Sequence, residues 1–151
     1  MAKPCVFCEV IAGGNGTAGE ETLVVDEPDV VAFLDIRPLF PGHLLIVPRQ
    51  LVEGDDVLPP EQLAPLFGVA QRAVTAMQTA LGAQGAFVAN NNIVSQSVPH
   101  LHVHVVPRTK GDGLKGFFWP RRGYRDEAHR LEVLHTPVSY THLTLPTKRI
   151  V

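Results

Sequence analysis

The stretch SVPHLHVHVVPR, residues 97–108, places three of the chain's seven histidines at every second position. The residues between these histidines are aliphatic and mostly β-branched, which favours a strand. Because alternate side chains of a strand share one face, we expect His100, His102 and His104 to point the same way while the aliphatic side chains enter the core. The pattern predicts a strand over residues 100–106 whose imidazole face binds a substrate or a metal.

Length and charge exclude several classes of protein. The 151 residues fit one domain that can bury a hydrophobic core. The formal net charge is −2 at pH 7, without a basic block, which argues against a nucleic-acid interface. No apolar run reaches membrane-spanning length, and the start of the chain, MAKPCVFCEVIAGG, lacks the apolar core of a signal peptide. We therefore expect a cytoplasmic protein that binds neither nucleic acid nor a membrane.

The remaining pattern predicts an α+β fold. Four further apolar runs, bounded by turn residues, predict strands over 22–26, 30–35, 43–49 and 85–91. Apolar residues at spacings of three and four predict one long helix over about 60–81, which Gly82 would end. A short helix is expected after the first cysteines. Strands gathered around one long helix favour a five-stranded antiparallel sheet.

The C-terminal segment PVSYTHLTLPTKRIV, residues 137–151, differs from the chain before it and contains no Asp or Glu. Its core, VSYTHLTLPT, resembles the in-frame translation of a transposon-end sequencing adaptor. We therefore expect one domain over residues 1–136, a non-native tail over 137–151, and a native chain that is cut short near His135. The alternative is a genuine short terminal strand.

Several stretches together resemble the histidine-triad (HIT) superfamily. The motif HLHVHVV fits the triad itself, and FLDIRPLFPGHLLIVPR (33–49) resembles the family's ribose-binding strand–loop–strand. CVFC (5–8) resembles the N-terminus of bacterial members, and NNNIVSQSVPHLHVHVVPR (90–108) resembles the phosphate-binding stretch. The matches cover about residues 4–108. The third histidine, where the nucleotidyltransferase branch has Gln, is typical of the histidine-triad nucleotide-binding hydrolases.

The resemblance implies a homodimer with a five-stranded antiparallel sheet in each subunit. It also implies hydrolysis of purine nucleoside phosphoramidates or dinucleoside polyphosphates, with release of a nucleoside monophosphate. His102 would be the nucleophile, because a neutral imidazole can attack the α-phosphate and form a nucleotidyl-histidine. His104 would donate to the phosphoryl oxygens as charge develops.

The resemblance assigns further contacts to residues on two loops. Ser97 would bond the leaving-group atom or a phosphate oxygen, and Gln96 and Asn90 would contact phosphate. Asp35 would accept both ribose hydroxyls, while Ile36, together with Phe33, would line the base pocket. An alternative for Asp35 is a residue that only stabilises the following turn.

The two cysteines of the chain, Cys5 and Cys8, form a C-x-x-C pair, which is half of a tetrahedral zinc site. His43 and His100 could complete a Cys₂His₂ set, and bacterial members of the family resemble this pattern. Four protein ligands would make the zinc structural, and it would hold the N-terminus near the active site. Alternatively, both histidines serve only in hydrogen bonds around the triad, and the cysteines are free thiols.

Three other functions stay open. The triad itself could bind a catalytic zinc, although Ser97 and Gln96 just upstream favour phosphate chemistry. The chain could be a nucleotide-binding regulatory module with negligible turnover. Finally, it could be a diadenosine polyphosphate phosphorylase, in which phosphate rather than water accepts the nucleotidyl group.

Overall fold

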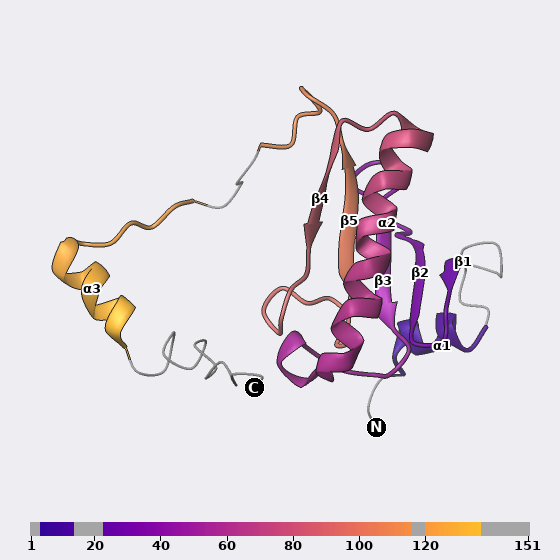
Figure 1. The fold of residues 1–151 in the computed structure, drawn as a ribbon, viewed down its shortest axis with the longest axis horizontal. Coiled ribbons are helices and arrows are strands. Elements are labelled where there is room, and N and C mark those ends of the chain that lie inside the picture. The colour runs from indigo at the N-terminus through magenta and orange to yellow at the C-terminus, as the bar shows by residue number, and fades with distance from the viewer. Residues whose placement is uncertain (1–3, 14–22, 116–119, 137–151) are drawn as a thin grey trace, which may run out of the picture. The chain divides into compact units, whose positions relative to one another are not determined.

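The computed structural model describes residues 4–13, 23–115 and 120–136. The chain divides into two compact units, Met1–Asp112 and Gly113–Val151. The first unit is an antiparallel sheet with the strand order β1-β2-β3-β5-β4 (Figure 1). Its strands are β1 (Leu23–Asp26), β2 (Val30–Leu34), β3 (Leu44–Pro48), β4 (Gly85–Ala89) and β5 (Val103–Arg108). The predicted five-stranded antiparallel sheet and α+β class are confirmed.

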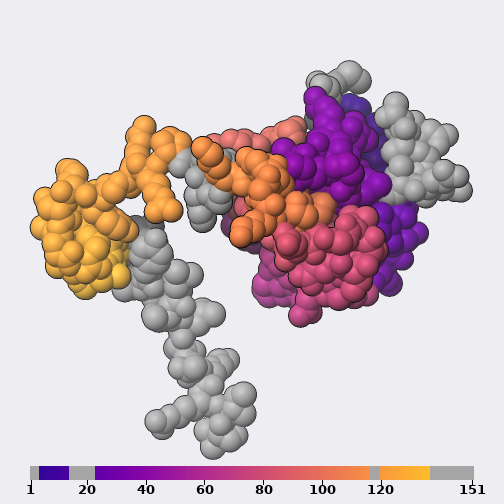
Figure 2. Space-filling view, turned by 90° about the horizontal axis from the view of Figure 1, so that it is seen from above, coloured from indigo at the N-terminus to yellow at the C-terminus, as the bar shows by residue number. Residues whose placement is uncertain are grey.

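Two helices of the first unit pack on opposite faces of this sheet. The long helix α2 (Leu63–Leu81) contacts β2, β3, β4 and β5, and the short helix α1 (Val6–Ile11) lies on the other face. Alternation along the strands separates the two cores, because neighbouring residues of a strand face opposite sides. In β2, for example, Val30 and Ala32 pack toward α2, whereas Val31 and Phe33 pack with Phe7 of α1. Figure 2 shows segments of this unit packed directly against one another.

Helix α2 begins three residues later than the predicted helix over about 60–81. Residues Pro60–Gln62 form a 3-10 turn before the α-helix begins at Leu63. Gly82 ends the helix in the left-handed conformation, with φ 66°, and its N–H donates to Met77 O. A residue without a Cβ adopts this conformation at low cost, so the predicted end at Gly82 is confirmed.

The predicted histidine strand begins three residues later than the sequence pattern indicates. Strand β5 starts at Val103, so only His104 of the triad lies within it. Pairing with β3 cannot continue, because Pro48 has no N–H and its carbonyl oxygen is 2.7 Å from His100 Nε2. Leu101 N instead donates to Val52 O at 2.7 Å. The prediction of a strand over 100–106 was therefore wrong at its first three residues.

The loop between β2 and β3 is closed by backbone hydrogen bonds. Asp35 N donates to His43 O at 2.9 Å, and His43 N donates to Phe40 O at 3.0 Å. Gly42 has φ 97°, and a Cβ at this position would lie 2.5 Å from Leu81 Cδ1 at the end of α2. The exposed end of Leu81 could move aside, but a side chain at this φ would strain the backbone, so the conformation of the loop favours glycine.

The second unit contains the helix α3 (Glu127–His135) among its described residues. Asp126 caps this helix by accepting from His129 N at 2.7 Å. The predicted non-native tail, residues 137–151, lies outside the described residues, so the boundary after residue 136 stays a prediction. None of the described helices combines the length and apolar character needed to span a bilayer.

Candidate active site

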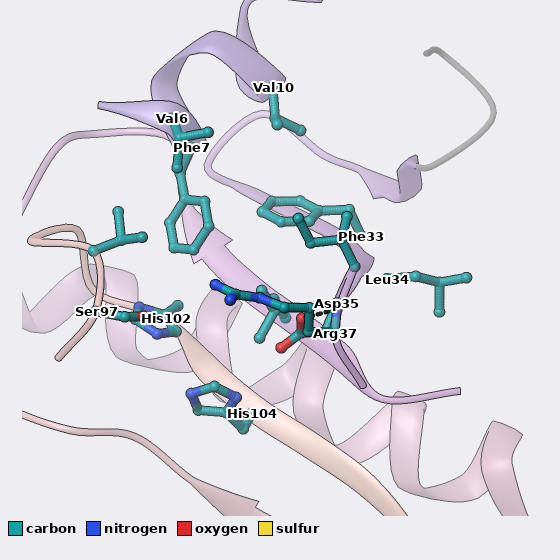
Figure 3. Close-up of a pocket in the computed structure, with 13 residues that line it drawn as sticks. Val6, Phe7, Val10, Phe33, Leu34, Asp35, Arg37, Ser97, His102 and His104 are labelled. Carbon is teal, nitrogen blue, oxygen red and sulfur yellow. Dashed lines mark hydrogen bonds between the residues drawn. The ribbon is translucent and has the colours of Figure 1, made fainter. Parts of the chain in front are cut away.

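A cavity of about 410 Å³ opens on the sheet face that carries α1. One wall is apolar and comes from α1, through Val6, Phe7 and Val10 (Figure 3). A second apolar wall comes from the end of β2 and the loop after it, through Phe33, Leu34 and Ile36. The polar lining side chains are Asp35, Arg37, Ser97, His102 and His104. The cavity therefore combines two apolar walls with a small set of polar groups, as ligand sites commonly do.

His102 lies on the floor of this cavity in a defined tautomer. The residue is 3% exposed, and its ring packs edge-on against Phe7 with ring centroids 5.1 Å apart. His102 Nδ1 is 2.8 Å from the carbonyl oxygen of His100, which can only accept a hydrogen bond. Nδ1 therefore carries the proton, and the neutral ring keeps its lone pair on Nε2.

His104 has the opposite arrangement, which His43 imposes. Leu39 N donates to His43 Nδ1 at 3.2 Å, so the proton of the neutral His43 ring is on Nε2. His43 Nε2 is 2.9 Å from His104 Nδ1 and donates to it. His104 must then carry its own proton on Nε2. The two neighbouring rings, with centroids 4.9 Å apart, thus offer one free lone pair and one N–H donor.

Burial keeps the second of these rings neutral. The pKa of His104 is lowered from its ordinary value of 6.5 to about 4. Desolvation is the largest cause, followed by the neighbouring His102 and His43, while the Asp35 carboxylate acts in the opposite direction. Desolvation also lowers the pKa of His43. Near pH 7, His104 is therefore a neutral hydrogen-bond donor.

The carboxylate of Asp35 contacts the backbone of the following turn and the ring of His43. Its Oδ1 accepts from Arg37 N at 2.8 Å, so the turn role considered for this residue is present. Its Oδ2 is 3.7 Å from His43 Nδ1. The carboxylate nevertheless lines the cavity with a side chain that is 20% exposed, so it can accept from a bound hydroxyl.

The cysteine pair lies beside the cavity and gathers around His100. Cys5 Sγ and Cys8 Sγ are 3.4 and 3.6 Å from His100 Nδ1, and the three ligand atoms lie within 4.8 Å of one another. His100 Nε2 donates to Pro48 O, which leaves Nδ1 unprotonated and facing the two thiols. Two thiols and an imidazole nitrogen oriented by a backbone carbonyl are a donor set that fits zinc.

His43 is not part of this set, in contrast to the predicted Cys₂His₂ site. Its side chain lies with Asp35 and His104, in a second group of potential ligand atoms. Both of its ring nitrogens already take part in hydrogen bonds. The structure therefore brings three of the four predicted zinc ligands together and places His43 in the hydrogen-bonding role that the sequence left as the alternative.

Two predicted phosphate contacts are directed elsewhere. Asn90 Nδ2 donates to Asp55 Oδ2 at 2.8 Å, and Gln96 Nε2 donates to Glu53 O at 2.6 Å. Neither side chain lines the cavity, whereas Ser97 does. Their amide groups thus tie the segment before His100 to residues 53 and 55.

Phe7 and Arg37 are among the cavity residues that sequence reasoning missed. Phe7 lies inside the C-x-x-C motif, and only packing of α1 on the sheet shows that its ring contacts His102. Arg37 follows Asp35 by two residues, a spacing that a tight turn brings onto the same side. The sequence could have indicated Arg37 as a cavity residue, because it is a cation two positions after the predicted ribose-binding Asp35.

Comparison with known proteins agrees with the geometry. Residues 17–111 match the family described as HIT domain. An uncharacterised HIT-like protein of Methanocaldococcus jannaschii is 37% identical over 111 residues, covering 72% of this chain and 82% of that protein. The adenosine 5′-monophosphoramidase of Schizosaccharomyces pombe is 27% identical, covering 77% and 83%. The asymmetrical bis(5′-nucleosyl)-tetraphosphatase of the same yeast is 32% identical, covering 54% and 46%.

Solved structures share the fold. A HIT family protein of Bacillus subtilis has a TM-score of 0.75 at 27% identity, covering 95% of this chain and 98% of that one. A zinc-bound histidine triad family protein of Mycobacterium smegmatis has a TM-score of 0.67 at 34% identity, covering 84% and 88%.

Proposed function

The chain belongs to the HIT domain family, and from this premise we propose that it is a nucleotide hydrolase. It would cleave the α-phosphate bond of purine nucleoside phosphoramidates or dinucleoside polyphosphates, the two substrate types that the yeast relatives' names include. The observation that carries the proposal is the opposed pair of tautomers, a lone pair on His102 Nε2 beside an N–H on His104 Nε2.

The two tautomers support a double displacement. His102 Nε2 attacks the α-phosphorus, and the bond from phosphorus to the leaving group breaks as the N–P bond forms. The Nε2 proton of His104 is directed to a phosphoryl oxygen or to the departing atom, where negative charge develops. Ser97 adds a hydroxyl donor at the same end of the cavity. Water then attacks the nucleotidyl-histidine, which releases the nucleoside monophosphate and restores His102.

The rest of the cavity accommodates the nucleoside. Asp35 accepts hydrogen bonds from the ribose hydroxyls through the part of its carboxylate that Arg37 N does not occupy. The apolar walls around Phe33 and Ile36 receive the base, and they carry no group that distinguishes adenine from guanine. The phosphate contacts of Asn90 and Gln96 stay a prediction, and both amides would have to leave their present partners to make them.

Hydrolysis of adenosine 5′-monophosphoramidate tests the proposal, with AMP release as the readout. We expect turnover by the full chain and its loss in His102→Ala. A nucleotidyl-enzyme trapped by rapid quench should be stable in alkali and labile in acid, as an N–P bond to histidine is. His135→Ala, on the exposed end of α3, is the matched control and should leave turnover unchanged. A folded chain that binds AMP but releases none from substrate would overturn the hydrolase and favour the binding-module alternative.

Two alternative reactions are separated by the same assay. With diadenosine tetraphosphate as substrate, hydrolysis would give AMP and ATP, whereas phosphorolysis would give ADP and ATP and would require added inorganic phosphate. A catalytic zinc held by the triad would have to displace the hydrogen bond between His43 and His104, which occupies the lone pair of His104 Nδ1. Activity that survives thorough chelation would exclude that zinc.

Zinc at Cys5, Cys8 and His100 is part of the proposal. The donor set and the zinc-bound relative of M. smegmatis support it. These three ligands join α1 to the loop before β5, which is a structural role. Within the described part of the chain they leave one position of a tetrahedral ion for a small exogenous ligand, unlike the closed four-ligand site that the sequence predicted.

We also retain the homodimer and a cytoplasmic location as proposals. Among the described residues, β1 and β4 are the two edge strands. β1 contains a register shift between Leu23 and Val25, which disfavours pairing with another chain, whereas β4 pairs regularly along all five of its residues. The edge of β4 is therefore the better place for a second copy to add its sheet.

A further inference from the structure

Arg37 differs from the other arginines of the first unit. Arg49, Arg72 and Arg108 each form an ion pair with a carboxylate. For the Arg37 guanidinium, no such pair exists among the described residues. Its side chain instead extends into the cavity, toward Phe7 and His102 (Figure 3). An arginine that faces a cavity without a carboxylate partner is available to bind an anion.

The backbone of Arg37 is held in place, so the direction of its side chain is not arbitrary. Arg37 N donates to Asp35 Oδ1 at 2.8 Å, and Pro38 restricts the conformation of the residue before it. The surrounding loop is closed by the hydrogen bond from Asp35 N to His43 O. The guanidinium is thus carried by a tight turn at the exposed mouth of the cavity.

The charges of the other polar groups in the cavity make the position of Arg37 important. His104 is neutral near pH 7, because its pKa is lowered to about 4, and Asp35 contributes a negative charge. Among the described residues that line the cavity, Arg37 is the one lysine or arginine. Within this set, a nucleotide with several phosphates would therefore find its positive counterpart at Arg37.

The direction of the reaction indicates which part of a substrate meets this cation. In an in-line displacement the leaving group departs on the side of the phosphorus opposite to the attacking atom. The attacking Nε2 belongs to His102 on the buried floor, whereas Arg37 is exposed at the mouth. A leaving group that departs away from this floor therefore moves toward the open side of the cavity, which the exposed Arg37 lines.

We propose that Arg37 binds an anionic leaving group and makes the site prefer nucleotides whose α-phosphate is joined to a further phosphate or sulfate. A substrate with a neutral amine as leaving group gains nothing from this cation. The inference rests on the proposed hydrolase function and narrows its substrate class. It assigns Arg37 to specificity, while His102 and His104 perform the displacement on either substrate type.

The test compares kcat/KM for diadenosine triphosphate and for adenosine 5′-monophosphoramidate in the wild type, Arg37→Gln and Arg37→Lys. We expect Arg37→Gln to lower kcat/KM for the triphosphate roughly tenfold, as the loss of one charge-assisted contact does. The value for the phosphoramidate should change less than twofold, and Arg37→Lys should retain most of the triphosphate activity. Arg72→Gln removes an exposed arginine on α2 and controls for net charge; it should affect neither substrate.

Two outcomes would overturn the inference. Equal losses on both substrates would place Arg37 on the α-phosphate, and no loss on either would make it a surface side chain. A second readout separates this result from failure of the hydrolase proposal. The affinities of AMP, ADP and ATP, measured by calorimetry, should increase with added phosphates in the wild type and much less in Arg37→Gln. If no substrate is turned over while this difference persists, the hydrolase proposal fails and the role of Arg37 stands.

Discussion

Two neighbouring imidazoles of this chain carry their protons on different nitrogens because different groups hold their Nδ1 atoms. A backbone carbonyl accepts from His102, so its Nε2 is free to attack. A ring nitrogen donates to His104, so its Nε2 keeps the proton. The chemistry thus depends on His43, which lies outside the triad motif and 61 residues before His104 in the sequence.

The lowered pKa of His104 predicts a loss of stability in mild acid. The unfolded chain takes up a proton at this histidine near its ordinary pKa of 6.5, whereas the folded chain does so only near 4. The free energy of unfolding should therefore fall as the pH decreases from 6.5 to 4, by about 3 kcal/mol at most from this residue. The lowered pKa of His43 acts in the same direction.

Urea unfolding at pH 7, 5.5 and 4.5 measures this effect. His104→Gln should flatten the dependence on pH across that interval, while His135→Gln, on an exposed helix end, should reproduce the wild-type slope. Identical slopes for the wild type and His104→Gln would show that the pKa of this ring is not lowered in the folded chain.

At the scale of elements, α1 belongs to two sites at once. Its N-terminal cap Cys5 and the next cysteine face His100, and its Phe7 packs on His102 and Phe33. A helix of six residues has little stability of its own, so these contacts must hold it. Loss of a metal from the cysteines should therefore loosen one wall of the nucleotide cavity.

Replacing both thiols, in the double variant Cys5→Ser and Cys8→Ser, tests this coupling. We expect bound zinc, measured by plasma mass spectrometry, to fall from about one per chain to none, and AMP affinity to weaken roughly tenfold. Hydrogen exchange should show faster opening of α1. Glu9→Gln, an exposed position on the same helix, should leave all three measurements unchanged. Unaltered affinity in a metal-free variant would mean that Phe7 alone positions the helix.

At the scale of the whole molecule, the two edges of the sheet differ in what they offer a second copy. We expect sedimentation velocity to show a dimer formed through β4. Val88→Lys places a charge on this strand, where Val88 is 39% exposed, and should shift the equilibrium toward monomer. Val24→Lys, on the opposite edge strand at 58% exposure, should not. A dimer that responds to Val24→Lys alone would place the interface at β1.

Much of the fold was predictable because it depends on local patterns. Apolar runs bounded by turn residues indicated four strands, alternation indicated the histidine strand, and spacings of three and four indicated α2. Gly82 marked its end, since the left-handed conformation is a property of one residue. The start of β5 was not predictable, because it depends on Pro48, which belongs to another strand and cannot supply an N–H there.

The candidate site divides in the same way. The spacing of the triad placed three imidazoles on one side of the chain, and C-x-x-C indicated metal ligands; both follow from residues a few positions apart. Which histidine joins the cysteines, which nitrogen of each ring is protonated and which arginine faces the cavity depend on partners that are distant in sequence. Those partners meet only when the β2–β3 loop, α1 and the segment before β5 pack on one face of the sheet. Whether the Nε2 atom of a histidine carries a lone pair or a proton is decided by the acceptor or donor that its Nδ1 atom meets. Only folding brings that partner into place.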